Sequence, residues 1–209
     1  MAETVKLYDL APSPNNMKVR IALSYKKIPF EKIPVSSNDR SEVIRISGQP
    51  LTPVLTHGTT VIFDSGAILR YLDANFRSTP SLFSTDYDTM TEIERWENLG
   101  RVELSRSVGT IFRQFFSPTK DSAAMERASK QLHDLTGGFE DRLSRASWLV
   151  GDRMTAADLS TAPMIYYGML PTTVASESPL HKLFFDHFHL GEGRTKTREW
   201  VTRVMAFDK

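Results

Sequence analysis

The most informative part of the sequence is VKLYDLAPSPNNMKVRIALSYKK, residues 5–27. Its first residues alternate between apolar and polar side chains, which predicts a strand over Val5–Tyr8. Turn-forming and helix-capping residues follow, and the apolar spacing beyond them predicts a helix over Met17–Lys27. The polar end of that helix, Lys26 and Lys27, suits the negative end of a helix dipole.

Further elements are predicted up to residue 76. They are a strand, a short helix, the two strands of a hairpin and a last helix, at residues 28–35, 39–46, 53–56, 60–63 and 65–74. Two prolines in the first of these strands favour an edge of the sheet. The order is βαβαββα, and its strand–helix–strand start favours parallel pairing of the first two strands. The prediction is a mixed sheet flanked by helices.

Strand patterns nearly vanish after a polar, turn-rich stretch that we interpret as a linker at residues 77–87. Apolar spacing then predicts only helices, over residues 89–116, 121–147, 157–170, 179–188 and 195–205. The fold class is therefore an α/β domain at residues 1–76 followed by an all-α domain at residues 88–209. Thr155 and Asp158 form the pattern of a capping box, which indicates a role in folding.

Composition excludes several classes of function. The 209 residues include 26 Lys and Arg against 25 Asp and Glu, so a net charge of +1 gives no electrostatic reason to expect nucleic acid or an anionic membrane. Without cysteine, the chain has no disulfide, thiolate metal site or thiol nucleophile of its own. His187 and His189 lack a partner acid at metal-site spacing, so we expect no metal.

The location is expected to be cytoplasmic. No apolar run approaches the roughly 20 residues that a membrane-spanning helix needs. The opening residues also lack the charged start and apolar stretch of a secretory signal.

Four segments resemble segments of one protein family, and they occur in the family's order. They are SPNNMKVRIAL (13–23), GQPLTPVL (48–55), DSGAILRYL (64–72) and WLVGDRMTAADL (148–159). With the predicted domain layout, the chain resembles cytosolic glutathione S-transferases of the serine type, bacterial-like, over nearly its whole length. The resemblance implies a thioredoxin-like first domain, glutathione as co-substrate, a homodimer and a role in detoxification.

The resemblance implies that Ser13 is the catalytic residue. A hydroxyl that donates a hydrogen bond to the sulfur of glutathione would favour the thiolate, and a helix N-terminus would add to this effect. Asn15 is a second candidate donor, and the sequence leaves open which of the two dominates. Asn16 is interpreted as a helix cap. A serine between a strand and a helix is often only a cap, and that interpretation also stays open for Ser13.

Five residues are candidates for binding glutathione. By resemblance, the peptide bond before Pro53 is cis, which would leave the backbone of Thr52 free to pair with the tripeptide. Asp64 and Ser65 begin a helix, where the γ-glutamyl carboxylate could meet the N–H and the hydroxyl of Ser65 and its ammonium group could meet Asp64. A plain helix cap is the alternative for this pair. Gln49 is a further candidate, with a solvated loop position as the alternative.

A hydrophobic electrophile would complete the reaction. Its candidate pocket residues are Phe112, Phe115, Phe116 and Tyr166, although aromatic residues at helical spacing more often belong to a core. The sequence therefore predicts a transferase that conjugates glutathione, with peroxide reduction as a related activity. The alternatives are a non-catalytic protein of the same fold that binds ligands or a partner, and a glutathione-dependent isomerase.

Overall fold

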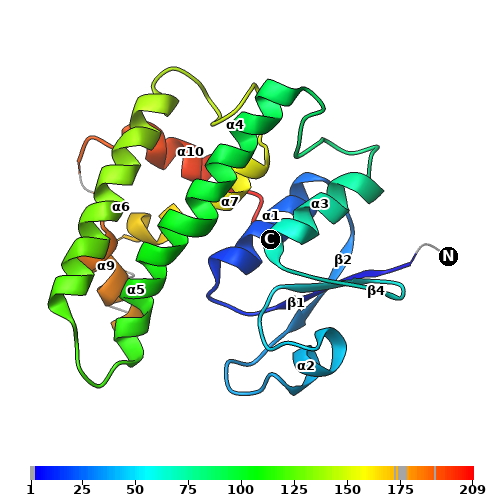
Figure 1. The fold of residues 1–209 in the computed structure, drawn as a ribbon, viewed down its shortest axis with the longest axis horizontal. Helices are drawn as coiled ribbons and strands as arrows, with labels where there is room; N and C mark the ends of the chain where they lie inside the picture. The colour runs from blue at the N-terminus through cyan, green and yellow to red at the C-terminus, as the bar shows by residue number, and fades with distance from the viewer. Residues whose placement is uncertain (1–2, 172, 174–177, 191) are drawn as a thin grey trace. The chain divides into compact units, whose positions relative to one another are not determined.

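The computed structural model describes residues 3–171, 173, 178–190 and 192–209. The chain forms two compact units, one of residues 1–85 with 206–209 and one of residues 86–205. The first contains all the strands that Figure 1 labels, and the second is helical. Among the described residues, no helix combines the length and apolar character needed to cross a bilayer.

A four-stranded sheet forms the centre of the first unit. Its strands are β1 (Val5–Asp9), β2 (Phe30–Pro34), β3 (Val54–His57) and β4 (Thr60–Phe63), in the order β2-β1-β3-β4. β1 is parallel to β2 and antiparallel to β3, and β3 pairs with β4 as a hairpin. The edge position of the proline-containing strand, its parallel pairing and the hairpin confirm the sequence predictions.

Helices cover both faces of this sheet. α1 (Pro14–Tyr25) and α3 (Ser65–Asn75) lie on one face, and α2 (Ser41–Ser47) lies on the other (Figure 1). Tyr8 and Val54 are paired across β1 and β3 and pack with Val43 of α2. Because side chains alternate along a strand, their fully buried neighbours Leu7 and Leu55 point to the α1 and α3 side.

The structure corrects the limits of the first helix. α1 begins at Pro14, three residues before the predicted Met17, with Ser13 as its N-cap. Proline is well suited to the first helical position, because an N–H group there would have no acceptor within the helix. Lys26 lies beyond the end of the helix and is fully buried rather than polar surface, because its Nζ pairs with Asp73 at 2.8 Å.

The second unit consists of helices connected by turns. Their ranges are α4 (Tyr87–Asn98), a π-helical segment (Leu99–Leu104), α5 (Ser105–Phe116), α6 (Ser122–Leu143), α7 (Ala156–Tyr166), a 3-10 turn (Tyr167–Met169), α9 (Pro179–Phe188) and α10 (Thr195–Met205). The long helix predicted over residues 89–116 is therefore interrupted by π-helical turns. α6 continues through Gly137 and Gly138 without a break.

A close approach between two backbones accompanies the π-helical segment. A Cβ atom at Gly100 would overlap the backbone carbonyl of Ser160 in α7. Only glycine allows the two helices to come this close. The sequence prediction missed this irregularity because nothing near Gly100 in the sequence signals a contact with residue 160.

The predicted capping box is present at the start of α7. Asp158 accepts hydrogen bonds from the backbone N–H groups of Thr155 (2.9 Å) and Leu149 (3.1 Å) and from the indole of Trp200 (2.8 Å). Asp158 is fully buried, so these donors replace the water that the carboxylate loses. The structural interpretation of this motif is confirmed.

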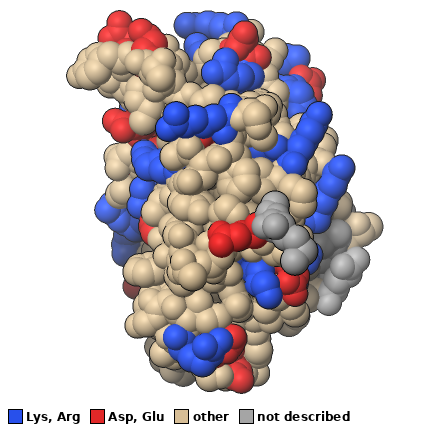
Figure 2. Space-filling view, turned by 90° about the vertical axis from the view of Figure 1, so that its right-hand side faces the viewer, with Lys and Arg blue, Asp and Glu red and all other residues tan. Residues whose placement is uncertain are grey.

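Charges are mixed on the surface in view in Figure 2. Lys and Arg side chains lie interspersed with Asp and Glu around a broad uncharged area. This pattern agrees with the near balance of charges in the sequence.

Candidate functional site

Ser13 lies where β1 has ended and α1 begins. Its backbone is extended (φ −151°, ψ 120°), and its Oγ accepts a hydrogen bond from the N–H of Asn16 at 3.5 Å. Accepting this bond uses a lone pair, so the hydroxyl proton remains available for another acceptor. The partial positive charge of the helix N-terminus lies at the same place.

Asn16 connects three parts of the site. It is fully buried; its Nδ2 donates to Thr52 Oγ1 at 3.1 Å, and its Oδ1 accepts from the N–H of Leu10 at 3.3 Å. The expectation that Asn16 caps the helix is therefore wrong, because Ser13 does so. Asn16 instead holds the first turn of α1 against the loop that carries Thr52. The structure thus brings Ser13 and Thr52 to the same part of the first unit.

The peptide bond between Thr52 and Pro53 is cis, as the resemblance implied, and the bond between Ala11 and Pro12 is cis as well. β3 begins at Val54, so Thr52 is outside the ladders on both sides of that strand. The backbone N–H and C=O of Thr52 therefore take no part in either ladder.

Gln49 is engaged with its own loop. Its Nε2 donates to Ser47 Oγ at 2.8 Å and to the carbonyl of Leu51 at 3.0 Å, and its Oε1 accepts from the N–H of Leu51 at 2.7 Å. These bonds order the loop that leads to Thr52.

Asp64 caps α3. Its Oδ1 accepts from the N–H groups of Gly66 (2.9 Å) and Ala67 (3.1 Å), and its φ of +68° is unusual for a residue other than glycine. Such conformations cost about 1–3 kcal/mol and concentrate at functional sites. The N–H of Ser65 is the first in the helix and has no acceptor within it.

Sequence reasoning missed Lys18, which joins this helix start to α1. Lys18 is only 1% exposed, and its Nζ donates to Ser65 Oγ at 3.1 Å. Ser65 Oγ in turn donates to Asn15 Oδ1 at 3.3 Å. The sequence shows Lys18 only as a polar position on a helix. Its partner is 47 residues away, and no local pattern signals that pairing.

The four candidate pocket residues belong to one series of aromatic contacts in the second unit. Ring centroids are 5.2 Å apart for Phe112 and Phe116, and 5.0 Å apart for Phe115 and Phe116. Phe184 continues the series, 6.5 Å from Phe112 and 4.8 Å from Tyr167, whose other neighbour is Tyr166 at 5.9 Å. Phe116 is 68% exposed, so the cluster reaches the surface.

Two family models match the chain. The model of the glutathione S-transferase N-terminal domain matches residues 7–80, and the model of the C-terminal domain matches residues 106–208. The chain belongs to the glutathione S-transferase family. The sheet with its helices is the thioredoxin-like half of this family's fold, and the helical unit is the other half.

Individual relatives of this glutathione S-transferase family member are distant. Glutathione S-transferase 3 of Zea mays is 24% identical over 184 residues, which are 84% of this chain and 80% of the relative. The structure of glutathione transferase URE2P8 from Phanerochaete chrysosporium with oxidized glutathione has a TM-score of 0.80 at 18% identity, over 98% of this chain and 90% of that chain. Ure2p in complex with glutathione has a TM-score of 0.73 at 21% identity, over 99% and 94%.

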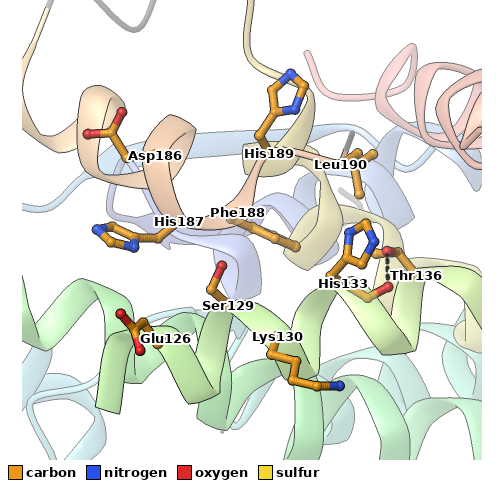
Figure 3. Close-up of a pocket in the computed structure, with 10 residues that line it drawn as sticks. All are labelled: Glu126, Ser129, Lys130, His133, Thr136, Asp186, His187, Phe188, His189 and Leu190. Atoms are coloured by element: carbon orange, nitrogen blue, oxygen red, sulfur yellow. Dashed lines mark hydrogen bonds between the residues drawn. The ribbon is translucent and has the colours of Figure 1, made fainter. Parts of the chain in front are cut away.

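A separate cavity of about 440 Å³ lies in the second unit of this family member, between α6 and α9. Figure 3 shows side chains of both signs around it, with Glu126, Lys130 and His133 from α6 and Asp186 and His187 from α9. In the described part of the chain, no three His, Cys, Asp or Glu side chains are placed to hold a metal ion.

Proposed function

We propose that this protein binds reduced glutathione in its first unit, stabilises the thiolate and transfers it to hydrophobic electrophiles. One observation carries the proposal: the hydroxyl of Ser13 accepts from the helix backbone and so keeps its proton for an anionic sulfur. The same thiolate could also reduce peroxides. By resemblance, we place this activity in detoxification in the cytoplasm.

The pKa of the glutathione thiol has to fall by an amount that one hydrogen bond can supply. An unperturbed thiol has a pKa of about 8.5, so only a few per cent is ionised at neutral pH. Each unit by which the pKa falls corresponds to about 1.4 kcal/mol of preference for the thiolate. One charge-assisted hydrogen bond supplies about 1.5–3 kcal/mol, so Ser13 needs only to donate and not to act as a base.

The tripeptide is placed by groups on three segments. The backbone of Thr52, beyond the cis bond to Pro53, pairs with the cysteine of glutathione as an added strand would. The N–H and the hydroxyl of Ser65 bind the γ-glutamyl carboxylate, and Asp64 binds its ammonium group. Gln49 contributes by ordering the loop before Thr52, since its amide is bonded within that loop.

The electrophile is assigned to the aromatic cluster of the second unit. Phe112, Phe115, Phe116 and Tyr166 lie in one series of ring contacts that reaches the surface, which suits an apolar co-substrate.

A homodimer accords with the resemblance. Several large apolar side chains of the first unit are exposed, among them Leu51 (73%), Phe63 (49%) and Ile44 (47%). In the second unit Tyr87 is 80% exposed. Apolar side chains exposed in this way commonly mark an interface, and a second copy of the chain would cover them.

The second candidate is a non-catalytic protein that binds glutathione, a ligand or a partner. The hydrogen bond from the N–H of Asn16 favours it, because capping α1 is by itself a sufficient reason for a serine at position 13.

Two measurements separate these functions. The first is retention on immobilised glutathione, and the second is conjugation of an aryl halide, each for the parent and for Ser13→Ala. The transferase proposal expects retention by both proteins and a rate that falls at least tenfold in the variant. Retention without turnover by the parent would contradict it and support the binding protein.

A further inference from the structure

Asn16 contacts two separate parts of the proposed glutathione site. Its side-chain Nδ2 donates to Thr52 Oγ1 at 3.1 Å, although the two residues are 36 positions apart in the sequence. Its backbone N–H donates to Ser13 Oγ at 3.5 Å. Asn16 is fully buried, so water does not reach its amide to take the place of Thr52. One residue is therefore bonded both to the hydroxyl proposed to meet the sulfur and to the loop proposed to hold the peptide backbone.

A backbone donor fixes the orientation of the Asn16 amide. The N–H of Leu10, which follows the last residue of β1, donates to Asn16 Oδ1 at 3.3 Å. A backbone N–H can only donate, so the oxygen of the amide faces Leu10 and its NH2 group faces Thr52 Oγ1, which accepts. The amide thus links the end of β1, the first turn of α1 and the loop before β3 in a single arrangement.

The covalent structure of glutathione requires such a link. A methylene group is all that separates the sulfur of its cysteine from the peptide backbone. A sulfur bonded by Ser13 and a cysteine backbone paired with Thr52 therefore cannot be placed independently of each other. Because a misplacement of about 1 Å is enough to impair a reaction, the distance between the two parts of the site has to be held closely.

We propose that Asn16 is a positioning residue, which holds the Thr52 backbone at the distance from the Ser13 hydroxyl that one glutathione molecule can span. This inference rests on the proposed function. The Asn16 side chain acts through Thr52 and needs no bond of its own to the tripeptide. Its loss should weaken glutathione binding and raise the thiol pKa together, whereas the loss of the Ser13 hydroxyl should raise the thiol pKa alone.

The test measures two quantities for each protein, the dissociation constant of glutathione by calorimetry and the thiol pKa of bound glutathione by thiolate absorbance against pH. Asn16→Leu removes the amide but keeps the backbone N–H that donates to Ser13 Oγ. We expect the dissociation constant to rise about three- to tenfold, as for the loss of one hydrogen bond. The thiol pKa should rise by about half a unit or more.

Thr52→Val is an independent variant should Asn16→Leu not fold. It removes the acceptor of the Asn16 amide but leaves the bond from Leu10 in place. Both quantities should change as in Asn16→Leu, and the double variant should be no worse than Asn16→Leu alone, because the two substitutions break the same bond. Thr52→Ser should restore most of the loss, since a serine hydroxyl accepts as a threonine hydroxyl does.

The Ser13→Ala background separates positioning from a direct effect on the sulfur. Without the Ser13 hydroxyl, its distance from the sulfur no longer matters. Adding Asn16→Leu to Ser13→Ala should therefore leave the thiol pKa unchanged while it still weakens glutathione binding. A further rise of the thiol pKa in this double variant would contradict the inference.

A matched control lies in the second unit. Thr161 is fully buried, and its Oγ1 donates to the carbonyl of Ala157 at 2.7 Å. Thr161→Val loses an internal hydroxyl as Thr52→Val does, so the two variants can be compared at similar cost to the fold. Thr161→Val should leave both the dissociation constant and the thiol pKa unchanged.

Other outcomes overturn the inference. Folded Asn16→Leu and Thr52→Val proteins with parental values would limit Asn16 to folding. A change in only one of the two quantities would show that the two parts of the site are not coupled through Asn16. If calorimetry finds no glutathione binding by the parent, the proposed function fails and this inference with it, whereas parental binding with unchanged variants overturns the positioning role alone.

Discussion

Arg20 of α1 binds Asp208, the penultimate residue of the chain, through two parallel hydrogen bonds. They join Nε to Oδ1 at 2.6 Å and Nη2 to Oδ2 at 2.8 Å. The Nη1 group of Arg20 also pairs with Asp9, at the end of β1, at 2.7 Å. Burial alone would lower the pKa of Arg20, but the hydrogen bonds and charges of Asp208 and Asp9 raise it above its ordinary value. The last residues are thereby fixed to the first unit.

Loss of this anchor should destabilise the first unit. Asp208→Asn removes the charge and one acceptor from a largely buried guanidinium, which should cost about 2 kcal/mol of unfolding free energy. Urea unfolding followed by circular dichroism measures it. The control is Glu42→Gln, which breaks the exposed two-point pair of Arg45 with Glu42 and should leave the midpoint unchanged. Equal midpoints for parent and Asp208→Asn would refute the anchor.

A second buried pair predicts a pH dependence of stability. Burial alone would raise the pKa of Asp73, but hydrogen bonds from Lys26, Leu82 and Ser81 outweigh it and hold the pKa below its ordinary value. The pair therefore contributes fully above the unfolded-state pKa of about 3.9, and the contribution is lost as pH falls through the folded-state pKa.

Asp73→Asn should thus cost about 3 kcal/mol at pH 7, and the difference from the parent should shrink below about pH 4. Urea titrations at several pH values from 7 to 2 measure both quantities. A difference that stays constant over this range would show that the carboxylate charge is not what stabilises the fold.

Two glycines in helical segments should respond in opposite directions to the same substitution. Gly100→Ala places a methyl group on the Ser160 carbonyl, which should cost about 1–3 kcal/mol through displacement of the backbones. Gly138→Ala meets nothing within 4 Å and lies inside α6, so it should stabilise the protein by about 0.5–1 kcal/mol. Thermal unfolding of both variants tests this, and a neutral Gly100→Ala would argue against the close helix contact.

Elements with local signals were predicted well from the sequence. The strands, the hairpin, α3, α9 and α10 follow periodicity and capping residues, and their limits agree within about two residues. The start of α1 was missed because Asn15 and Asn16 look like turn formers, although the helix already begins at Pro14. No local sequence pattern could reveal that Asn16 donates a hydrogen bond to Thr52, which lies 36 residues away.

Local signals also explain which residues of the candidate site the sequence pointed to and which it did not. Ser13, Thr52 and Ser65 stand out because each marks a turn or a helix start. Lys18 did not, because a lysine within a helix normally lies in water, and only the fold supplies the hydroxyl that lets it be buried. Lys26 was misinterpreted in the same way, since Asp73 is 47 residues distant. The periodicity of apolar residues gives no information about which polar side chains pair over long distances in the sequence.

The most direct test is a pH titration of the glutathione thiol bound to the parent and to Ser13→Ala. We predict a thiol pKa at least one unit below the ordinary value of about 8.5 in the parent, and a rise of about one unit or more in the variant. A parent that binds glutathione without lowering its thiol pKa would contradict thiolate stabilisation by Ser13.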